Sequence, residues 1–170
     1  MKLIIGNKNY SSWSLRAWLV LSAFDVPFDE VRIALYEDNF RAEIAKHTKA
    51  GKVPVLHDGD LVVWDSLAIC EYISEQFLDG GGWPATSHDR AMARSCCAEM
   101  HSGFFTLRAD MPMNCRAENR KVTISENLQK DISRIDTLWS ELRERYAAKG
   151  PWLCGQFSIV DCMFAPVVFR

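Results

Sequence analysis

The chain has 170 residues, of which 48% are hydrophobic and 25% are charged, the usual balance of a globular protein that buries a core. Its formal net charge is −2, which argues against nucleic acid or an anionic membrane as a partner. The N-terminal apolar run is too short for a signal peptide, and no window approaches the roughly 18 apolar residues of a membrane span. We therefore expect a cytoplasmic protein whose six cysteines are reduced and mostly lie in the core.

The first half of the sequence alternates strand and helix signals. Lys2–Ile5 is predicted to be a short buried strand, Ser14–Phe24 a helix that stops before Pro27, and Phe28–Ile33 a second strand. A strand, a helix and a strand in this order predict that the two strands are parallel. The polar stretch Glu37–His47 that follows is only weakly helical.

A hairpin and a helix complete this half. The apolar runs Val53–His57 and Leu61–Trp64 flank an Asp-Gly dipeptide, which is typical of tight hairpin turns. Ser66–Phe77 then carries apolar residues at helical spacing. The order β-α-β followed by β-β-α predicts a thioredoxin-like α/β domain over residues 1–78.

A breaker cluster separates this domain from the rest of the chain. Three consecutive glycines shortly before Pro84 indicate a linker over residues 79–87. No strand pattern follows, so residues 88–170 are expected to form an all-helical C-terminal domain, which is incomplete here. The predicted fold class is therefore an α/β thioredoxin-like N-terminal domain followed by a truncated all-α domain.

Three helices are expected in the second half. One long helix is predicted over Ser87–Asn114, with a bend near Pro112, and another over Ser125–Ala148, where apolar residues recur every three or four positions. Ser158 and Asp161 have the spacing of a capping box, in which the two side chains satisfy the first amides of a helix reciprocally. This box predicts that a last helix begins there.

Two serines, Ser11 and Ser12, lie between the first strand and the first helix. A hydroxyl at this junction is close to a helix N-terminus, where free amides and the helix dipole favour an anion. The two serines are therefore candidates for holding an anionic group. The alternative is that one of them simply caps the helix.

Two further segments carry candidate binding residues. Pro54 lies within a strand-like run, where proline indicates an edge strand or a cis bond after Val53 that presents the valine backbone to an extended ligand. At the end of the next strand, Ser66 is suited to hold an α-carboxylate and Asp65 an α-ammonium group. The alternative for Asp65 and Ser66 is an ordinary helix cap.

These segments, in this order, resemble the glutathione transferase superfamily over essentially the whole chain: the serine motif, the Val-Pro step, the Asp-Ser-Leu-Ala-Ile turn and the Trp152–Asp161 box. The serine motif is most similar to the serine-type classes, above all the zeta class, which includes maleylacetoacetate isomerases. Trp13 stands where zeta members usually carry cysteine. The resemblance implies a glutathione S-transferase with glutathione as co-substrate and an electrophilic small molecule as its partner.

The resemblance also implies how the thiolate is formed. Ser11 or Ser12 donates a hydrogen bond to the glutathione sulfur, and the family motif favours Ser11. A thiol of pKa ~8.5 is only about 3% thiolate at pH 7, so lowering the pKa by ~2 units, or roughly 2.7 kcal/mol, makes the nucleophile the major species. One charge-assisted hydrogen bond of ~1.5–3 kcal/mol and a helix N-terminus of ~0.3–1 kcal/mol are sufficient.

The rest of the tripeptide has its own implied partners. The resemblance places Lys52, or alternatively His47, beside the glycyl carboxylate, Val53 with cis Pro54 at the cysteinyl unit, and Asp65 with Ser66 at the γ-glutamyl end.

Other functions remain in view. A dithiol oxidoreductase is excluded, because it needs a cysteine at the first strand–helix junction, where this chain has serines and Trp13. A glutathione-dependent maleylacetoacetate cis–trans isomerase and a non-catalytic interaction protein of the same fold are the alternatives to a transferase.

A homodimer is expected, both from the resemblance and because an exposed aromatic such as Trp83 needs cover. No metal is expected, since His88 and His101 lack metal-ligating neighbours.

Overall fold

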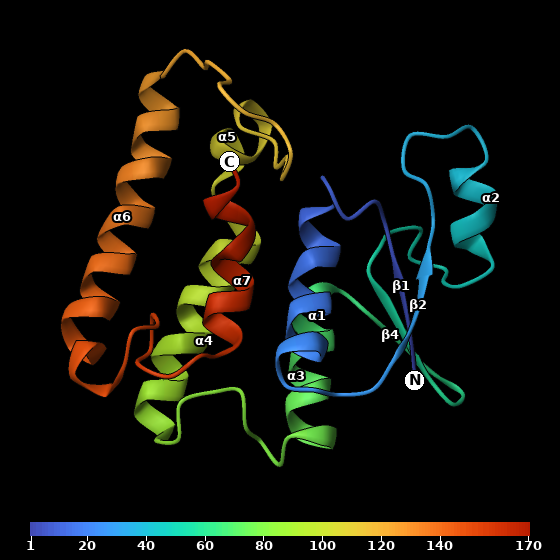
Figure 1. Ribbon diagram of the computed structural model, residues 1–170, viewed down its shortest axis with the longest axis horizontal. Coiled ribbons are helices and arrows are strands. Elements are labelled where there is room, and N and C mark those ends of the chain that lie inside the picture. Colours follow the sequence, from blue (N-terminus) through green and yellow to red (C-terminus); the bar gives the residue numbers. More distant parts are fainter. The chain divides into compact units, whose positions relative to one another are not determined.

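The computed structural model describes residues 1–170, which divide into two compact units, Met1–Gly80 and Gly81–Arg170 (Figure 1). The first unit combines a sheet with helices, and the second is helical apart from isolated β-bridges near Trp152. This is the predicted order of an α/β unit followed by a helical one. None of the helices has both the length and the apolar character needed to cross a membrane.

The first unit is built on a mixed four-stranded sheet. Its strands, in the spatial order β2-β1-β3-β4, are β1 (Lys2–Ile5), β2 (Asp29–Arg32), β3 (Val55–Asp58) and β4 (Leu61–Trp64). β1 and β2 are parallel, as predicted, whereas β3 is antiparallel to both β1 and β4. Gly59 lies in the predicted hairpin turn with φ +56°, a left-handed value that glycine adopts without steric cost.

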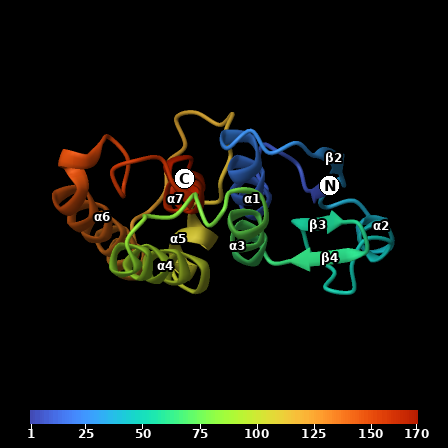
Figure 2. The same ribbon diagram turned by 90° about the horizontal axis from the view of Figure 1, so that it is seen from below.

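Helices cover both faces of this sheet. α1 (Ser12–Ala23) and α3 (Ser66–Phe77) pack against each other on one face, and the short α2 (Phe40–Ala45) lies on the other (Figure 2). α3 has the predicted bounds, whereas α1 begins two residues before the predicted Ser14. The first helical hydrogen bond of α1 runs from the Leu15 amide to the Ser11 carbonyl, at 3.0 Å.

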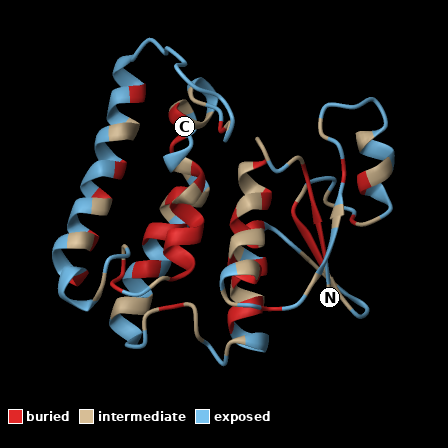
Figure 3. Cartoon of the chain, viewed as in Figure 1, coloured by how far each residue is buried: buried red, intermediate tan, exposed pale blue.

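The core of the first unit lies on both sides of β1. Ile4 packs with Ile44 of α2 in a cluster of buried apolar side chains. Because side chains alternate along a strand, Leu3 and Ile5 point to the opposite face, the side of α1 and α3. All three β1 residues are essentially without solvent exposure, and Figure 3 shows this burial along the strand. Packing from both sides thus fixes the direction and register of β1, on which the site described below depends.

The second unit contains four α-helices and one short 3₁₀ turn: α4 (Ser87–Ser102), α5 (Phe105–Asp110), α6 (Glu126–Tyr146), η1 (Ala147–Lys149) and α7 (Ile159–Val168). α4 packs against α7, and α5 packs against α6. The predicted helix over 125–148 corresponds to α6 with its 3₁₀ extension.

The prediction of one long helix over 87–114 with a bend at Pro112 is wrong, because the chain breaks at Gly103 and Phe104. The Gly103 amide still bonds to the Glu99 carbonyl at 2.8 Å, but Phe104 has a left-handed φ of +58°. The new helix is capped from a distance, since the Leu107 amide donates to the Asp131 carboxylate of α6 at 3.0 Å. α5 ends at Asp110, before the proline.

The predicted capping box at the start of α7 is confirmed. One carboxylate oxygen of Asp161 accepts hydrogen bonds from the Ser158 amide and the Ser158 hydroxyl, both at 2.9 Å. Its other oxygen accepts from the Leu153 amide at 3.0 Å, so the same side chain fixes the loop that precedes the helix.

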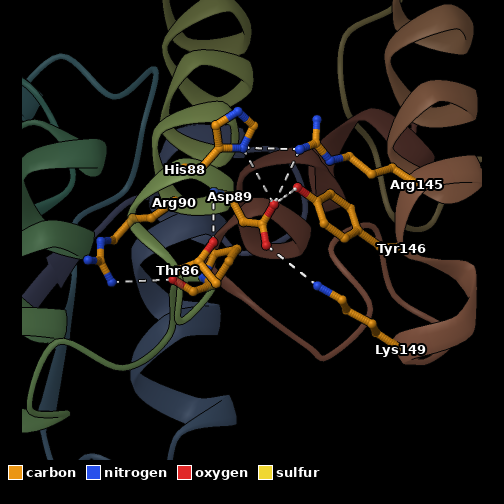
Figure 4. A network of polar contacts seen from close by, with 8 residues as sticks. Thr86, His88, Asp89, Arg90, Arg145, Tyr146 and Lys149 are labelled. Carbon is orange, nitrogen blue, oxygen red and sulfur yellow. Dashed lines mark hydrogen bonds and ion pairs between the residues drawn. The ribbon is translucent and has the colours of Figure 1, made fainter.

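A polar network around Asp89 joins the start of α4 to the end of α6 (Figure 4). Its carboxylate accepts a 2.6 Å hydrogen bond from the Tyr146 hydroxyl, and the Arg145 and Lys149 cations lie 3.6 and 3.5 Å away. The Tyr146 hydrogen bond is the main reason that the pKa of Asp89 falls to about 2. Burial, followed by the bond to Asp89, raises the pKa of Tyr146 to about 12.

The cysteines behave largely as predicted. All six are free thiols, and all are buried except Cys115. Burial raises the pKa of Cys70 and Cys154 to about 12, so these thiols remain protonated and act as small apolar side chains.

The expected exposure of Trp83 is wrong, since its side chain is only 7% exposed and the Arg94 guanidinium lies 5.5 Å from its ring centroid.

Candidate functional site

The register of the sheet brings the candidate segments to one edge. Val55 pairs with Ile4 near the end of β1 and with Trp64 at the end of β4. The chain that follows β1, the chain that precedes β3 and the chain that follows β4 therefore leave the sheet at the same edge. We refer to this as the serine edge, because the Ser11 loop follows β1 there.

Ser11 does not use its side chain to cap α1. It occupies the N-cap position with φ −81° and ψ 81°, but its hydroxyl makes no cap hydrogen bond. The Ser11 Oγ instead lies 2.8 Å from the Ser14 Oγ, and the Gly6 amide donates to the same Ser14 oxygen at 3.0 Å. The capping alternative for Ser11 is therefore wrong, and its hydroxyl belongs to a buried pair.

The two hydroxyls differ from that of Ser12 in their burial. Ser11 is 6% exposed and Ser14 2% exposed, whereas Ser12, the first residue of α1, is half-buried. Gly6 lies close to this pair, and a Cβ atom there would crowd it, at 2.9 Å from the Ser11 Oγ and 2.7 Å from the Leu35 side chain. Sequence reasoning missed Gly6 and Ser14. The spacing of Ser11 and Ser14 by three residues, one turn of helix, was the available signal.

The start of α1 has two features that favour an anion. Its first turn contains no acidic residue that would offset the helix dipole. Arg16 is entirely buried, and its guanidinium donates to the Ser12 carbonyl at 3.0 Å and lies 4.3 Å from the centroid of the Trp13 ring. A fixed cation and a helix N-terminus at one place favour an anion beside Ser11 and Ser12. Arg16 was also missed by sequence reasoning.

The segment before β3 has the expected backbone. The Val53–Pro54 peptide bond is cis. Val53 lies two residues ahead of the first paired residue of β3, where the ladder to β1 and β4 has ended. Lys52 is exposed beside it and follows Gly51, whose φ is +65°.

His47 lies away from the serine edge. Its backbone carbonyl is 2.8 Å from the Nε2 atom of His57, and His57 pairs with Lys2 at the opposite end of β1. Burial, followed by the nearby His57, lowers the pKa of His47. Of the two residues considered for a glycyl carboxylate, Lys52 is the one next to the serine edge.

Asp65 combines a cap with an unusual backbone. Its carboxylate accepts a hydrogen bond from the Leu67 amide at 2.9 Å, so it is the N-cap of α3. Its φ of 64° and ψ of 151° lie in a region that is occupied almost only by glycine. Such a conformation costs on the order of 1–3 kcal/mol and is concentrated at ligand-binding and catalytic sites. Capping alone does not require this geometry.

Ser66 has a buried hydroxyl without a partner. It is 2% exposed, and its Oγ atom makes no hydrogen bond within the protein. A buried polar group left unpaired costs about 1–3 kcal/mol, so each such group needs an explanation. Ser66 is also the first residue of α3, directly after the Asp65 carboxylate that caps the helix. The unpaired hydroxyl fits an anionic acceptor supplied by a ligand.

The fold is that of the glutathione transferases, a thioredoxin-like α/β unit followed by a helical unit. A glutathione transferase homologue from Burkholderia, solved with bound glutathione, superimposes with a TM-score of 0.73 at 22% identity, covering 98% of this chain and 78% of that one. Residues 10–76 match the family model of the glutathione S-transferase N-terminal domain. That match contains all of the candidate residues named above except Gly6.

Three relatives extend the comparison. The dichloromethane dehalogenase of Methylorubrum extorquens is 41% identical over 61 residues, 35% of this chain and 21% of the relative. Glutathione S-transferase Z1 of Arabidopsis thaliana is 32% identical over 102 residues, 56% of this chain and 46% of the relative. A stringent starvation protein A homologue of Haemophilus ducreyi is 23% identical over 158 residues, 93% of this chain and 69% of the relative. The chain thus spans less than half the length of the first two.

Proposed function

We propose that this chain is a member of the glutathione transferase superfamily that binds glutathione at the serine edge and stabilises its thiolate for attack on an electrophilic small molecule. The observation that carries the proposal is the unpaired, buried Ser66 hydroxyl next to the strained Asp65. These two residues lie at the same sheet edge as the start of α1, whose first turn has no acidic residue. A ligand that has a carboxylate, an ammonium group and an ionisable thiol matches all three features.

Each end of glutathione has a complementary group at this edge. The γ-glutamyl carboxylate would accept from the Ser66 hydroxyl, and the α-ammonium group would pair with the Asp65 carboxylate. The backbone of Val53 would pair with the cysteinyl unit, in the manner of an added strand. The exposed Lys52 would attract the glycyl carboxylate.

The thiolate would lie at the start of α1. The Ser11 hydroxyl, the helix N-terminus and the buried Arg16 all favour negative charge there. One charge-assisted hydrogen bond of ~1.5–3 kcal/mol together with the dipole term of ~0.3–1 kcal/mol lowers the thiol pKa by about two units. This chain then needs no separate general base, because the thiol proton leaves to solvent.

Calorimetric titration with glutathione tests this proposal. We expect binding by the natural chain, a large loss of affinity for Ser66→Ala and Asp65→Asn, and no change for the control Ser102→Ala, whose exposed hydroxyl bonds to the Ala98 carbonyl. Absence of binding by the folded natural chain would contradict the proposal. Equal affinity in all four proteins would place the ligand elsewhere.

A zeta-like isomerase of maleylacetoacetate is a second candidate. The 32% identity with glutathione S-transferase Z1 over 102 residues supports it. In this reaction the thiolate adds to the double bond, the adduct rotates, and the thiolate leaves again. Isomerisation of maleylacetone without net loss of glutathione would favour this candidate over a transferase, which consumes the tripeptide.

A non-catalytic protein of this fold is the third candidate, favoured by the similarity of 158 residues to a stringent starvation protein A homologue. It predicts no retention on glutathione resin.

For all three candidate functions we propose a homodimer. The support is no longer Trp83 but Leu61 and Trp64 of the edge strand β4, which are 47% and 57% exposed. The six free thiols fit a cytoplasmic location.

A further inference from the structure

We propose that Ser14 is a positioning residue that orients the Ser11 hydroxyl toward the glutathione thiolate. This inference rests on the proposed function, because it concerns how the thiolate is held. Ser14 projects from the first turn of α1, is 2% exposed, and is not adjacent to Ser11 in sequence.

The geometry of three groups carries the inference. The Gly6 amide donates to the Ser14 Oγ at 3.0 Å, and the Ser14 and Ser11 oxygens are 2.8 Å apart. An amide can only donate, so one lone pair of the Ser14 oxygen is committed to Gly6. The remaining question is which of the two hydroxyls donates to the other.

The count of hydrogens answers this question when a thiolate is present. Each hydroxyl has one hydrogen and accepts up to two hydrogen bonds. If Ser11 donates to Ser14, the Ser14 hydrogen has no acceptor among the protein hydrogen bonds of this buried pair. If Ser14 donates to Ser11, the Ser11 hydrogen is released for an outside acceptor and every group of the pair is used. A thiolate beside Ser11 is such an acceptor.

The resulting chain runs from the Gly6 amide through Ser14 and Ser11 to the sulfur. No proton is transferred between the two oxygen atoms, since both hydroxyls only rotate about their C–O bonds. Hydrogen bonds in a chain polarise one another, so Ser11 becomes a better donor when Ser14 donates to it. Burial of both side chains keeps water from replacing Ser14 in this role.

Ser14 also restricts the rotation of the Ser11 hydroxyl. A free hydroxyl distributes its hydrogen over three staggered positions, whereas an accepted hydrogen bond from Ser14 disfavours the position that points back at Ser14. Two positions remain when Ser14 donates, so removing Ser14 lowers the fraction of correctly oriented donors from one half to one third, or about 0.2 pKa unit of the bound thiol. The lost polarisation, roughly 10–30% of the strength of the Ser11 hydrogen bond, adds a few tenths of a unit, for a total of about half a unit.

The experiment is a pH titration of thiolate ultraviolet absorbance for glutathione bound to the natural chain, Ser14→Ala, Ser11→Ala and the double variant. We expect the thiol pKa to rise by about half a unit in Ser14→Ala and by one to about two units in Ser11→Ala. The double variant should match Ser11→Ala, because Ser14 acts only through Ser11. Glutathione affinity at low pH, where the thiol is neutral, should remain within about twofold throughout.

Ser14→Thr retains the hydroxyl and should restore the natural pKa, which a purely structural role of Ser14 does not predict. Ser14→Thr also keeps the proposal testable if Ser14→Ala fails to fold after losing the acceptor of the Gly6 amide. An unchanged thiol pKa in Ser14→Ala, or additive shifts in the double variant, would overturn the role of Ser14 while leaving the proposed function intact. If no variant, and not even the natural chain, binds glutathione, it is the proposed function that fails.

Discussion

Replacing Ser66 with alanine should have opposite effects on stability and on ligand binding. In the free protein the Ser66 hydroxyl is buried and unpaired, at a cost of about 1–3 kcal/mol. Its removal relieves that cost and leaves only a small cavity, so the free energy of unfolding should rise or stay constant. With glutathione bound, the same hydroxyl donates to a carboxylate, and hydrogen bonds to charged groups contribute about 1.5–3 kcal/mol.

The expected loss of affinity follows from these values. A loss of about 1.5–3 kcal/mol corresponds to a dissociation constant roughly ten- to 150-fold higher. Urea unfolding monitored by circular dichroism gives the stability of the free proteins, and calorimetry gives the affinity. Ser102→Ala is the matched control, because at an exposed helical serine it measures the gain in helix propensity together with the loss of one exposed hydrogen bond, the one to the Ala98 carbonyl.

Two results would refute this reasoning. A clear loss of stability in free Ser66→Ala would show that the hydroxyl is paired in solution. Unchanged glutathione affinity would show that Ser66 does not contact the ligand, whatever its effect on folding.

Three further predictions concern other parts of the chain. Ser11→Ala should reduce turnover at pH 7 by roughly ten- to a hundredfold with little change in glutathione affinity, and Ser12→Ala should not; equal effects in steady-state kinetics would remove the distinction between the serines. The pKa of Asp89 is lowered to about 2, so its contribution to stability is present above pH 4 or so and is lost as the pH falls through about 2. Asp89→Asn should abolish that part of the acid dependence of the unfolding temperature, and an unaltered acid profile would mean that the bond to Tyr146 does not form. Gly103→Ala should lower the free energy of unfolding, measured by urea denaturation, by about 1–3 kcal/mol, because its Cβ would lie 2.8 Å from the Glu99 carbonyl oxygen. A stabilised variant would show that the backbone at the helix break adjusts to a side chain without cost.

Much of the fold could be predicted because its signals are local. The strands of the first unit have short apolar runs bounded by turn residues, and the Asp-Gly turn fixes which two of them pair. The capping box likewise needs only two residues at the correct spacing. These features depend on neighbours in sequence, so no tertiary contact had to be known.

The break in the long helix was not predictable in this way. A single glycine within a helical pattern is usually tolerated, at a cost of about 1 kcal/mol. Here the new helix start at Phe105 is stabilised by Asp131, which comes from α6 and lies 24 residues from Leu107 in sequence. The proline that attracted the prediction lies beyond the end of α5.

The candidate site was predictable in its residue types but not in its contacts. The serine pair, the Val-Pro step and the Asp-Ser turn could be read from their order along the chain. The pairing of Ser11 with Ser14 could not, because it depends on the close approach of Gly6 across the end of β1. The positive φ of Asp65 could not be read either, since an aspartate gives no signal for a backbone conformation that glycine usually adopts.

The pKa of the glutathione thiol in the presence of saturating natural chain tests the central claim most directly. Free thiols of this kind have a pKa of ~8.5, and the start of α1 with Ser11 should lower that value by about two units. A thiolate absorbance transition near pH 6.5, roughly, is the predicted result. Demonstrated binding with a transition that stays at the free value would contradict the claim that this edge of the sheet activates the thiol.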